Sequence, residues 1–441
     1  MIAVVALVAA VASPVQSGEW AGYMQRGASR LQVTIEMPSG ETASAFFSAP
    51  ALGAIEIPLR NVTLRQSVHW ELTGDTSTTE FDGTVNGTTI TGTFRDPAGN
   101  GSFLLQLASL STEKPYQKQE VNFQNGPVTL AGTVYAPKGT GKHPAMIFVH
   151  GSGAEGRWGA AYLADYVARR GIVALIYDKR GVGASTGDWR ASTMEDLIGD
   201  ARAGVALLAR RADVDQNNIG VYGHSQGSTI APAIAQNNPN VAWIIAADGY
   251  VGPNYQQDLY RVDRMLSKRY SGTDLAQAER VYAEMVDLAR SGASLQPLYS
   301  DVQRYKNAPW LADLGIPSED NWVWAWYRKT GNYNNQSAWA TVRVPVLIIF
   351  GADDQLVPLQ SIAATTAILR ENGDRNVLVH VFPKADHTLH VPPASSSGWP
   401  SLPDGFPQII VDFATHASAA TSSVPALGAG YAVARGYAEL A

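Results

Sequence analysis

The sequence predicts an α/β protein in which a mostly parallel sheet is flanked by helices, with a helical insertion and a separate N-terminal all-β domain. Short, continuous apolar runs such as 145–149 and 344–350 are typical of strands buried on both faces of a sheet. Before residue 109, by contrast, apolar and polar residues alternate between turn residues. The length of 441 residues also exceeds the ~250–300 that one core usually holds, so more than one domain is expected.

The first apolar stretch, residues 2–12, resembles a signal peptide. It is too short to span a bilayer, and Ala10-Val11-Ala12 before Ser13 resembles a small-residue cleavage site. A positively charged segment in front of it is missing, so a buried strand or helix stays an alternative. We expect residues 1–17 to be a signal peptide, the chain to have no membrane span, and the protein to be secreted or periplasmic.

Residues 18–112 are predicted to form an all-β domain. Three segments, 30–37, 67–72 and 88–94, alternate apolar and polar residues, and Gly, Pro, Asn or Asp residues separate them. Short strands with turn signals at this spacing are typical of a β-sandwich or a small barrel. The segment contains no catalytic constellation, so we expect an accessory or dimerising domain rather than a dedicated ligand-binding one.

Residues 113–416 carry the pattern of the α/β domain. Two segments, 120–123 and 128–135, are expected to be its first, antiparallel strands. Further strands are expected at 145–149, 172–177, 218–222, 241–247, 344–350 and 377–382. The Ala-rich residues 417–441 show no strong pattern and are expected to be a tail.

The run 218–222 leads into Gly223-His224-Ser225-Gln226-Gly227, a G-x-S-x-G pattern, and a helix start follows it. A serine at such a turn has a strained backbone that presents its hydroxyl, while the glycines let strand and helix approach closely. The pattern alone is a weak signal in a chain with 41 glycines. Because a serine hydroxyl is a poor nucleophile at neutral pH, chemistry here also needs a base and an orienting carboxylate.

A candidate base and a candidate carboxylate both lie after predicted strands further along the chain. Asp354 lies in the loop after the run 344–350, and His387 lies in the loop after the run 377–382. We therefore expect Ser225 to be the nucleophile, His387 the base and Asp354 the acid.

Two other aspartates compete for the role of the acid. Asp353 is the neighbour of Asp354, and Asp248 ends the run that follows the Ser225 turn. Asp354 is preferred because it fits the spacing G-x-x-D-x-x-V-P, which begins at Gly351.

Four separated motifs resemble those of bacterial α/β-hydrolases of the esterase, dienelactone hydrolase and serine aminopeptidase type. They are His150 to Gly153, Asp178 to Ser185, the Ser225 turn, and Gly351 to Pro358 with His387. The resemblance covers about residues 120–416 and implies the α/β-hydrolase fold, whose triad order is serine, acid, histidine. It also implies an oxyanion hole made by the backbone amides of Ser152 and Gln226.

The distance along the chain between nucleophile and acid predicts an insertion. Asp354 follows Ser225 by 129 positions, whereas two strand–helix units with loops of typical length use ~60. We assign residues 249–343 to a helical cap over the active site, because apolar residues recur at helical spacing in 259–266 and 275–288. Five tryptophans of this segment are expected either to line a substrate pocket or to pack the cap: Trp310, Trp322, Trp324, Trp326 and Trp339.

The resemblance favours a serine carboxylic-ester hydrolase that acts on a small-molecule ester through an acyl-enzyme. The alternative on the same fold is a peptidase that releases small N-terminal residues. Such a peptidase needs an acidic group in the cap to bind the substrate amine. Five cap residues could supply it: Asp258, Asp263, Glu279, Glu284 and Asp287.

Two further alternatives belong to other classes. Gly151, Gly153 and Gly156 spell G-x-G-x-x-G after a predicted strand, with Asp178 downstream, as in a dinucleotide-binding oxidoreductase. That interpretation leaves the Ser225 triad unexplained, and in a hydrolase Asp178 and Arg180 are expected to be structural. A non-catalytic binding protein on the same fold is disfavoured by the complete triad.

Composition limits the partners. The formal charge of −6 without a basic run argues against nucleic acid. Cysteine is absent, which excludes disulfides, thiolate metal sites and a cysteine nucleophile. The eight histidines do not cluster with carboxylates at ligand spacing, so we expect no metal and no cofactor. The sequence does not determine the oligomeric state.

Overall fold

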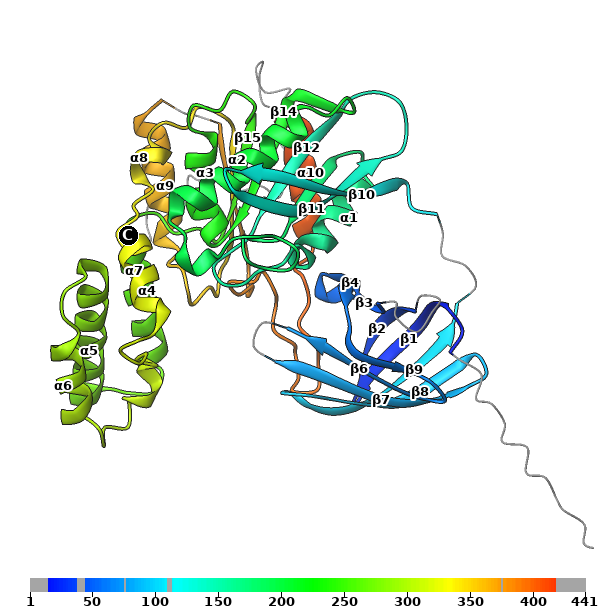
Figure 1. Cartoon of the computed structure of the whole chain (residues 1–441), viewed down its shortest axis with the longest axis horizontal. Coiled ribbons are helices and arrows are strands. Elements are labelled where there is room, and N and C mark those ends of the chain that lie inside the picture. Colours follow the sequence, from blue (N-terminus) through cyan, green and yellow to red (C-terminus); the bar gives the residue numbers. More distant parts are fainter. Residues whose placement is uncertain (1–14, 38–43, 75–76, 109–112, 374–375, 418–441) are drawn as a thin grey trace, which may run out of the picture. The chain divides into compact units, whose positions relative to one another are not determined.

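The computed structural model describes residues 15–37, 44–74, 77–108, 113–373 and 376–417 (Figure 1). Most of the expected signal peptide and the tail after residue 417 lie outside the described residues, so secretion stays a prediction. Within the described ranges, no helix is both long and apolar enough to cross a membrane. The chain divides into two compact units, Met1–Glu113 with Pro392–Ser401, and Lys114–Val391 with Leu402–Ala441.

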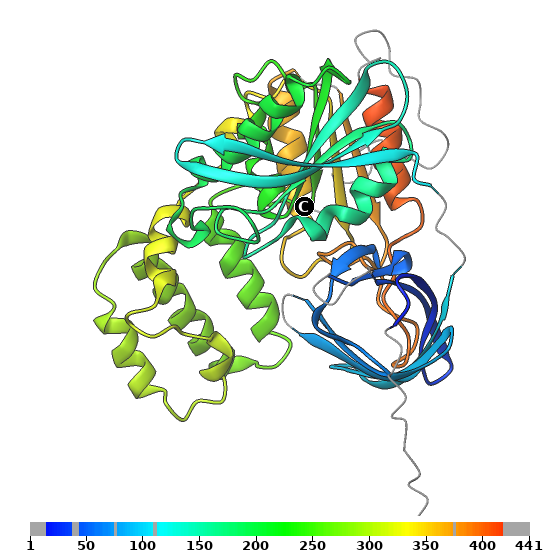
Figure 2. The ribbon, with the colours of Figure 1, turned by 45° about the vertical axis from the view of Figure 1, so that its right-hand side comes forward.

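The first unit is a single antiparallel sheet of nine strands in the order β4-β3-β2-β1-β9-β8-β7-β6-β5. The all-β prediction is confirmed, but the sandwich alternative is wrong, because all nine strands pair within one curled sheet (Figure 2). The strands are β1 (Gly18–Arg26), β2 (Ser29–Met37), β3 (Phe46–Ala49), β4 (Ala54–Pro58), β5 (Arg60–Leu64), β6 (Ser67–Thr73), β7 (Thr78–Asn86), β8 (Thr89–Asp96) and β9 (Gly99–Leu107).

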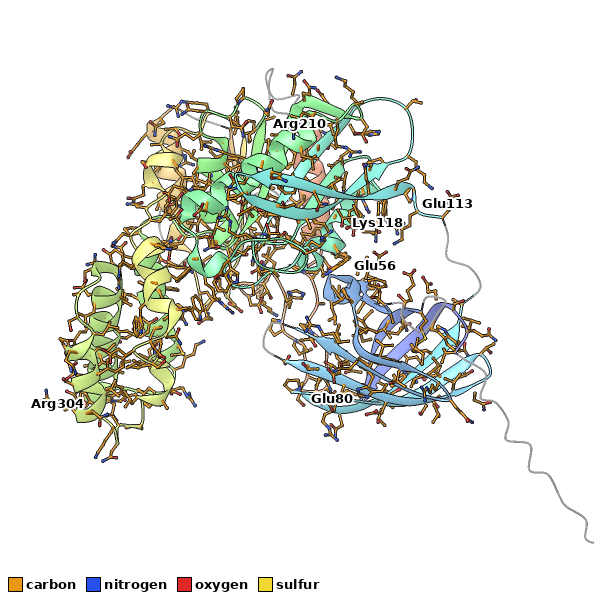
Figure 3. The ribbon with its side chains drawn as sticks, in the orientation of Figure 1. Glu56, Glu80, Glu113, Lys118, Arg210 and Arg304 are labelled. Atoms are coloured by element: carbon orange, nitrogen blue, oxygen red, sulfur yellow. The ribbon has the colours of Figure 1, made fainter. Side chains whose placement is uncertain are left out.

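The core of this sheet is aromatic. In β6, Trp70 is buried and stacks on Phe81 of β7 at a ring-centroid distance of 5.6 Å, and Phe103 of β9 closes the group 5.8 Å from Phe81. Residues one position away along a strand point to the opposite face, as the exposed Glu80 does beside Phe81 (Figure 3). This alternation is the pattern from which the strands were predicted.

Residues 392–401 belong to the first unit although they follow the α/β strands in sequence. The indole of Trp399 lies 4.2 Å from the guanidinium of Arg26 and 5.7 Å, between ring centroids, from Phe94. The predicted boundaries assigned this segment to the hydrolase domain. Nothing in its local pattern shows that its tryptophan packs on strands more than 300 positions earlier.

The second unit contains an eight-stranded sheet in the order β10-β11-β13-β12-β14-β15-β16-β17. β10 and β11 run antiparallel to each other, β11 runs antiparallel to β13, and the remaining pairs are parallel. The strands are β10 (Tyr116–Asn125), β11 (Val128–Pro137), β12 (His143–Val149), β13 (Val173–Tyr177), β14 (Val214–His224), β15 (Trp243–Ala247), β16 (Val346–Gly351) and β17 (Val377–Phe382). All eight strands expected from the sequence are present.

Helices cover both faces of this sheet, which is why its central strands are continuously apolar (Figure 1). On one face pack α2 (Met194–Ala209), α3 (Gln226–Ala235) and α9 (Gln360–Glu371), and on the other α1 (Ala161–Ala168) and α10 (Phe406–His416). The carboxyl ends of the parallel strands meet at one edge, so the loops after β12, β14, β16 and β17 converge there.

The insertion between β15 and β16 is helical, as expected. Its helices are α4 (Asn254–Leu266), α5 (Gly272–Ser291), α6 (Gln296–Arg304), α7 (Trp322–Thr330) and α8 (Gln336–Trp339). α4, α5 and α6 bury a core of their own around Val262, Leu266 and Val281, while Arg304 at the end of α6 points outward (Figure 3).

The five tryptophans of the insertion divide between the two expected roles. Trp310 and Trp324 are buried in the core of the cap, and Trp339 is buried in the core of the sheet. Trp326 lines a cavity. Trp322 is 42% exposed, and its ring centroid lies 6.5 Å from that of Trp326.

Candidate active site

Ser225 lies at the sharp turn between β14 and α3. Its φ of 53° and ψ of −116° lie in a region that non-glycine residues rarely adopt. Glycine is required at both flanking positions because other backbone atoms come too close for a side chain. A Cβ on Gly223 would lie 2.4 Å from the carbonyl carbon of Gly227, and a Cβ on Gly227 would lie 2.1 Å from the carbonyl oxygen of Val149. The turn therefore presents the hydroxyl of Ser225 at the edge where the strands end.

The three residues expected to form a triad lie together. His387 Nε2 is 2.9 Å from Ser225 Oγ, and His387 Nδ1 is 2.8 Å from Asp354 Oδ2. Asp354 Oδ1 accepts hydrogen bonds from the backbone N–H groups of Leu356 and Val357, at 2.7 and 2.9 Å. The carboxylate is thus fixed on both oxygens. It can hold the imidazole in the tautomer whose Nε2 accepts the serine proton.

A second histidine, which sequence reasoning did not assign, supports this arrangement. His224 Nε2–H donates to the backbone carbonyl of His387 at 2.8 Å, and the two rings lie 5.2 Å apart. Burial, together with the nearby His387, lowers the pKa of His224 to about 4. His224 therefore stays neutral at physiological pH and acts as a donor that holds the loop of His387.

Asp248, the competing acid, is buried next to the triad. Its Oδ1 accepts from the backbone N–H of Gly351 at 2.8 Å, and its buried Oδ2 has no hydrogen-bond partner among the described residues. Burial, and then the charge of Asp354, raise the pKa of Asp248 well above its usual range. The raised pKa favours the neutral form of Asp248, and the carboxylate that contacts His387 Nδ1 is that of Asp354.

The same cluster has the spacing of a metal site. Asp248, Asp354 and His387 each offer a ligand atom within 4.8 Å of the other two. The hydrogen bonds of Asp354 and His387 described above account for this spacing without a metal, and the expectation of no metal stays a prediction.

The two residues expected to form the oxyanion hole flank Ser225. Ser152 follows β12, Gln226 is the first residue of α3, and both line the same cavity as Ser225. The first N–H groups of a helix have no acceptor within it, so the amide of Gln226 is available to a ligand. Near Ser152, the backbone N–H of Gly151 donates to Glu155 Oε2 at 2.8 Å.

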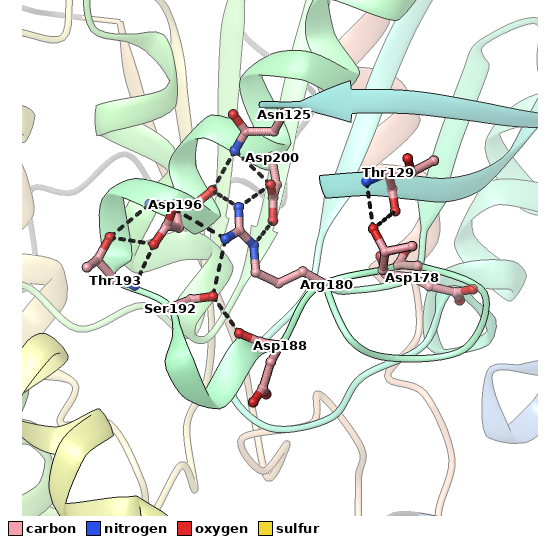
Figure 4. Close-up of polar contacts among 11 residues, drawn as sticks. Asn125, Thr129, Asp178, Arg180, Asp188, Ser192, Thr193, Asp196 and Asp200 are labelled. Carbon is pink, nitrogen blue, oxygen red and sulfur yellow. Dashed lines mark hydrogen bonds and ion pairs between the residues drawn. The ribbon is translucent and has the colours of Figure 1, made fainter. Parts of the chain in front are cut away.

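Asp178 and Arg180 are structural, as expected. Arg180 is held by both carboxylate oxygens of Asp200, at 2.6 and 2.7 Å (Figure 4). Asp178 is 3% exposed and accepts from the side chain of Arg157 at 2.9 Å and from the backbone N–H of Ala184 at 3.0 Å. These bonds brace the loop after β13.

The dinucleotide interpretation is wrong. The carboxylate of Asp178, which would have to bind a ribose hydroxyl, is buried and already occupied. In addition, only a 3-10 turn, Arg157–Ala160, follows Gly156, and the α-helix α1 begins at Ala161, so no α-helix starts at the glycine-rich turn.

A cavity of about 300 Å³ opens over Ser225. Ser152, Glu155, His224, Gln226 and His387 line it from the sheet side. The cap contributes Asn254, Gln257, Asp258, Arg261, Trp326, Tyr327, Thr330 and Gly331. The insertion is therefore a wall of the cavity that contains the candidate nucleophile.

Comparison with known proteins agrees with this fold. Residues 141–393, more than half of the chain, match the family described as serine aminopeptidase, S33. The chain belongs to this family, and it is a hydrolase with the α/β-hydrolase fold.

Among individual relatives, the chain is similar to esterase EstD of Thermotoga maritima, with 24% identity over 301 residues, 66% of each chain. It is also similar to the uncharacterized protein Rv2307c of Mycobacterium tuberculosis, with 30% identity over 28% of this chain and 43% of that protein. These matches thus span at most about two thirds of the relatives' length. A solved 2,6-dihydroxy-pseudo-oxynicotine hydrolase aligns with a TM-score of 0.46 at 18% identity, covering 73% of each chain.

Proposed function

We propose that this protein is a serine carboxylic-ester hydrolase that acts through an acyl-enzyme on Ser225. The observation that carries the proposal is the continuous hydrogen-bonded series from Asp354 through His387 to Ser225, which ends in a cavity. A serine hydroxyl is a useful nucleophile only when a positioned base can take its proton, and this series supplies that base.

The reaction follows from the positions of these groups. Ser225 Oγ attacks the ester carbonyl carbon while its proton passes to His387 Nε2, and the resulting oxyanion accepts hydrogen bonds from the amides of Ser152 and Gln226. Collapse of this intermediate breaks the bond to the alkoxy oxygen, which leaves as an alcohol with the proton from His387. Water then attacks the acyl group and gives a proton to His387. That proton returns to Ser225 as the carboxylic acid leaves.

The hydrogen bonds of Asp258, an acidic cap residue in the cavity, favour an uncharged substrate over a peptide with a free N-terminus. Of the five acidic cap residues considered for binding an amine, Asp258 lines the cavity. Its oxygens accept from Arg261 at 2.6 and 3.0 Å, from Tyr282 at 2.9 Å and from Tyr327 at 3.1 Å. A carboxylate with this many donors, one of them cationic, attracts a substrate ammonium weakly.

The substrate class is tested with p-nitrophenyl esters of graded chain length beside alanine p-nitroanilide and its N-acetyl form, each corrected for its alkaline hydrolysis rate. We expect the corrected kcat/KM of the preferred ester to exceed that of either anilide by at least about tenfold, ~1.4 kcal/mol in activation free energy. A free amino group should give no advantage over the N-acetyl form. Faster cleavage of the free-amine anilide than of every ester would instead establish the peptidase.

A further inference from the structure

One buried cation beside the candidate site, Lys179, has no part in the steps above. Lys179 follows β13, is 1% exposed, and donates from Nζ to the backbone carbonyl of Gly151 at 2.7 Å and to Gln226 Oε1 at 2.9 Å. Placing an ammonium group in a protein interior is unfavourable unless its partners compensate for the lost hydration, so the position of Lys179 needs an explanation. Both partners belong to the two segments that would form the oxyanion hole.

The bond to Gly151 fixes the peptide that contains one of the expected donors. The carbonyl of Gly151 and the N–H of Ser152 belong to the same peptide unit, and in a trans peptide these two groups point in opposite directions. When Lys179 holds the carbonyl, the N–H of Ser152 must point away from Lys179. Rotation of this peptide would break the Lys179 bond, while Glu155 restrains the preceding peptide through the N–H of Gly151.

The second bond ties the other donor to the same cation. Gln226 contributes its backbone N–H at the start of α3, and its side chain is held by Lys179. One ammonium group thus connects the loop after β12 with the turn after β14. It also places a positive charge behind the Ser152 peptide, where it would stabilise negative charge that develops on the far side.

We propose that Lys179 is a positioning residue that sets the orientation and the electrostatic potential of the oxyanion hole formed by Ser152 and Gln226. This role rests on the proposed function, because it has meaning only if an oxyanion forms beside Ser225.

The charge state of Lys179 gives the proposal a pH signature. Burial lowers the pKa of Lys179 to about 8, although the negative charges of Glu155 and Asp200 act to raise it. The other titratable neighbour, His150, is neutral because burial, and then the charge of Lys179, hold its pKa well below the usual range. Lys179 is therefore protonated at neutral pH and loses its charge as the pH rises through about 8, so activity should decline there.

The test compares Lys179→Met with Lys306→Met, a matched change at an exposed cap lysine, using p-nitrophenyl acetate. We expect Lys179→Met to lower kcat by about tenfold to a hundredfold with little change in KM, less than the loss of a direct oxyanion donor. Binding of a trifluoromethyl ketone, which forms an oxyanion on the serine, should weaken by a similar factor. The decline above pH about 8 should be present in the wild type and in Lys306→Met and absent in Lys179→Met.

Each outcome bears on one hypothesis. If Lys179→Met is folded, and its kcat and its decline in activity at alkaline pH equal those of Lys306→Met, the proposed role of Lys179 is wrong. This holds even when Ser225→Ala is inactive. Activity in Ser225→Ala overturns the proposed function instead. Should Lys179→Met not fold, the wild-type profile decides, because constant kcat/KM from neutral pH to well above pH 8 contradicts the proposal.

Discussion

Ser225→Ala is expected to remain folded and to lose ester hydrolysis, with kcat reduced by at least about 10⁴-fold. The change removes one hydroxyl oxygen, which contacts His387 at 2.9 Å, and it leaves the glycines that shape the turn in place. Without Oγ no acyl-enzyme can form, and the cavity and the amides alone give a small residual rate. Steady-state kinetics on p-nitrophenyl butyrate, with circular dichroism to establish folding, measures the effect.

Ser300→Ala is the matched control for this variant, because Ser300 is exposed on α6, away from the cavity lining. It should retain wild-type kinetics. Turnover by Ser225→Ala at a rate near that of Ser300→Ala would show that another residue is the nucleophile.

Asp354→Asn is expected to lower kcat by at least about a hundredfold, and Asp248→Asn and Asp353→Asn by much less. An amide at position 354 has the shape of the carboxylate, but its NH₂ group facing Nδ1 favours the imidazole tautomer whose Nε2 carries a proton. That tautomer cannot accept the proton of Ser225. Burial raises the pKa of Asp248 and so favours its neutral form, which the neutral amide replaces with little electrostatic change. Asp353 is exposed.

The three amide variants serve as controls for one another, because each replaces one carboxyl oxygen by nitrogen. Their kcat values on a single ester, with thermal unfolding curves to exclude loss of the fold, decide which aspartate is the acid. If Asp248→Asn is the most impaired of the folded variants, the acid lies after β15 rather than after β16.

Local sequence patterns predicted much of the fold and of the candidate site. The strands of the parallel sheet are continuous apolar runs, and the loops that follow them carry Ser225, Asp354 and His387. Because parallel strands end at one edge of a sheet, residues far apart in sequence could be expected to lie together. The length of the insertion and its helical periodicity predicted the cap in the same way.

The features that sequence reasoning missed depend on where a side chain points in three dimensions. His224 is part of the predicted turn, but its bond to the carbonyl of His387 requires the two loops to be placed. Lys179 belongs to a quoted motif, yet only the fold shows that its ammonium group contacts the carbonyl of Gly151 and the side chain of Gln226. Alternation predicted the strands of the first unit but not how many sheets they form.

The central claim is that Ser225 is the residue acylated during turnover, and covalent labelling tests it most directly. The protein is incubated with a p-nitrophenyl phosphonate ester, which forms a stable adduct on an activated serine, and the modified peptide is located by mass spectrometry. We expect one phosphonyl group on Ser225 per molecule, with activity lost in proportion to labelling and no incorporation in Ser225→Ala. Full inactivation with Ser225 unmodified, or full activity with Ser225 modified, would contradict the account.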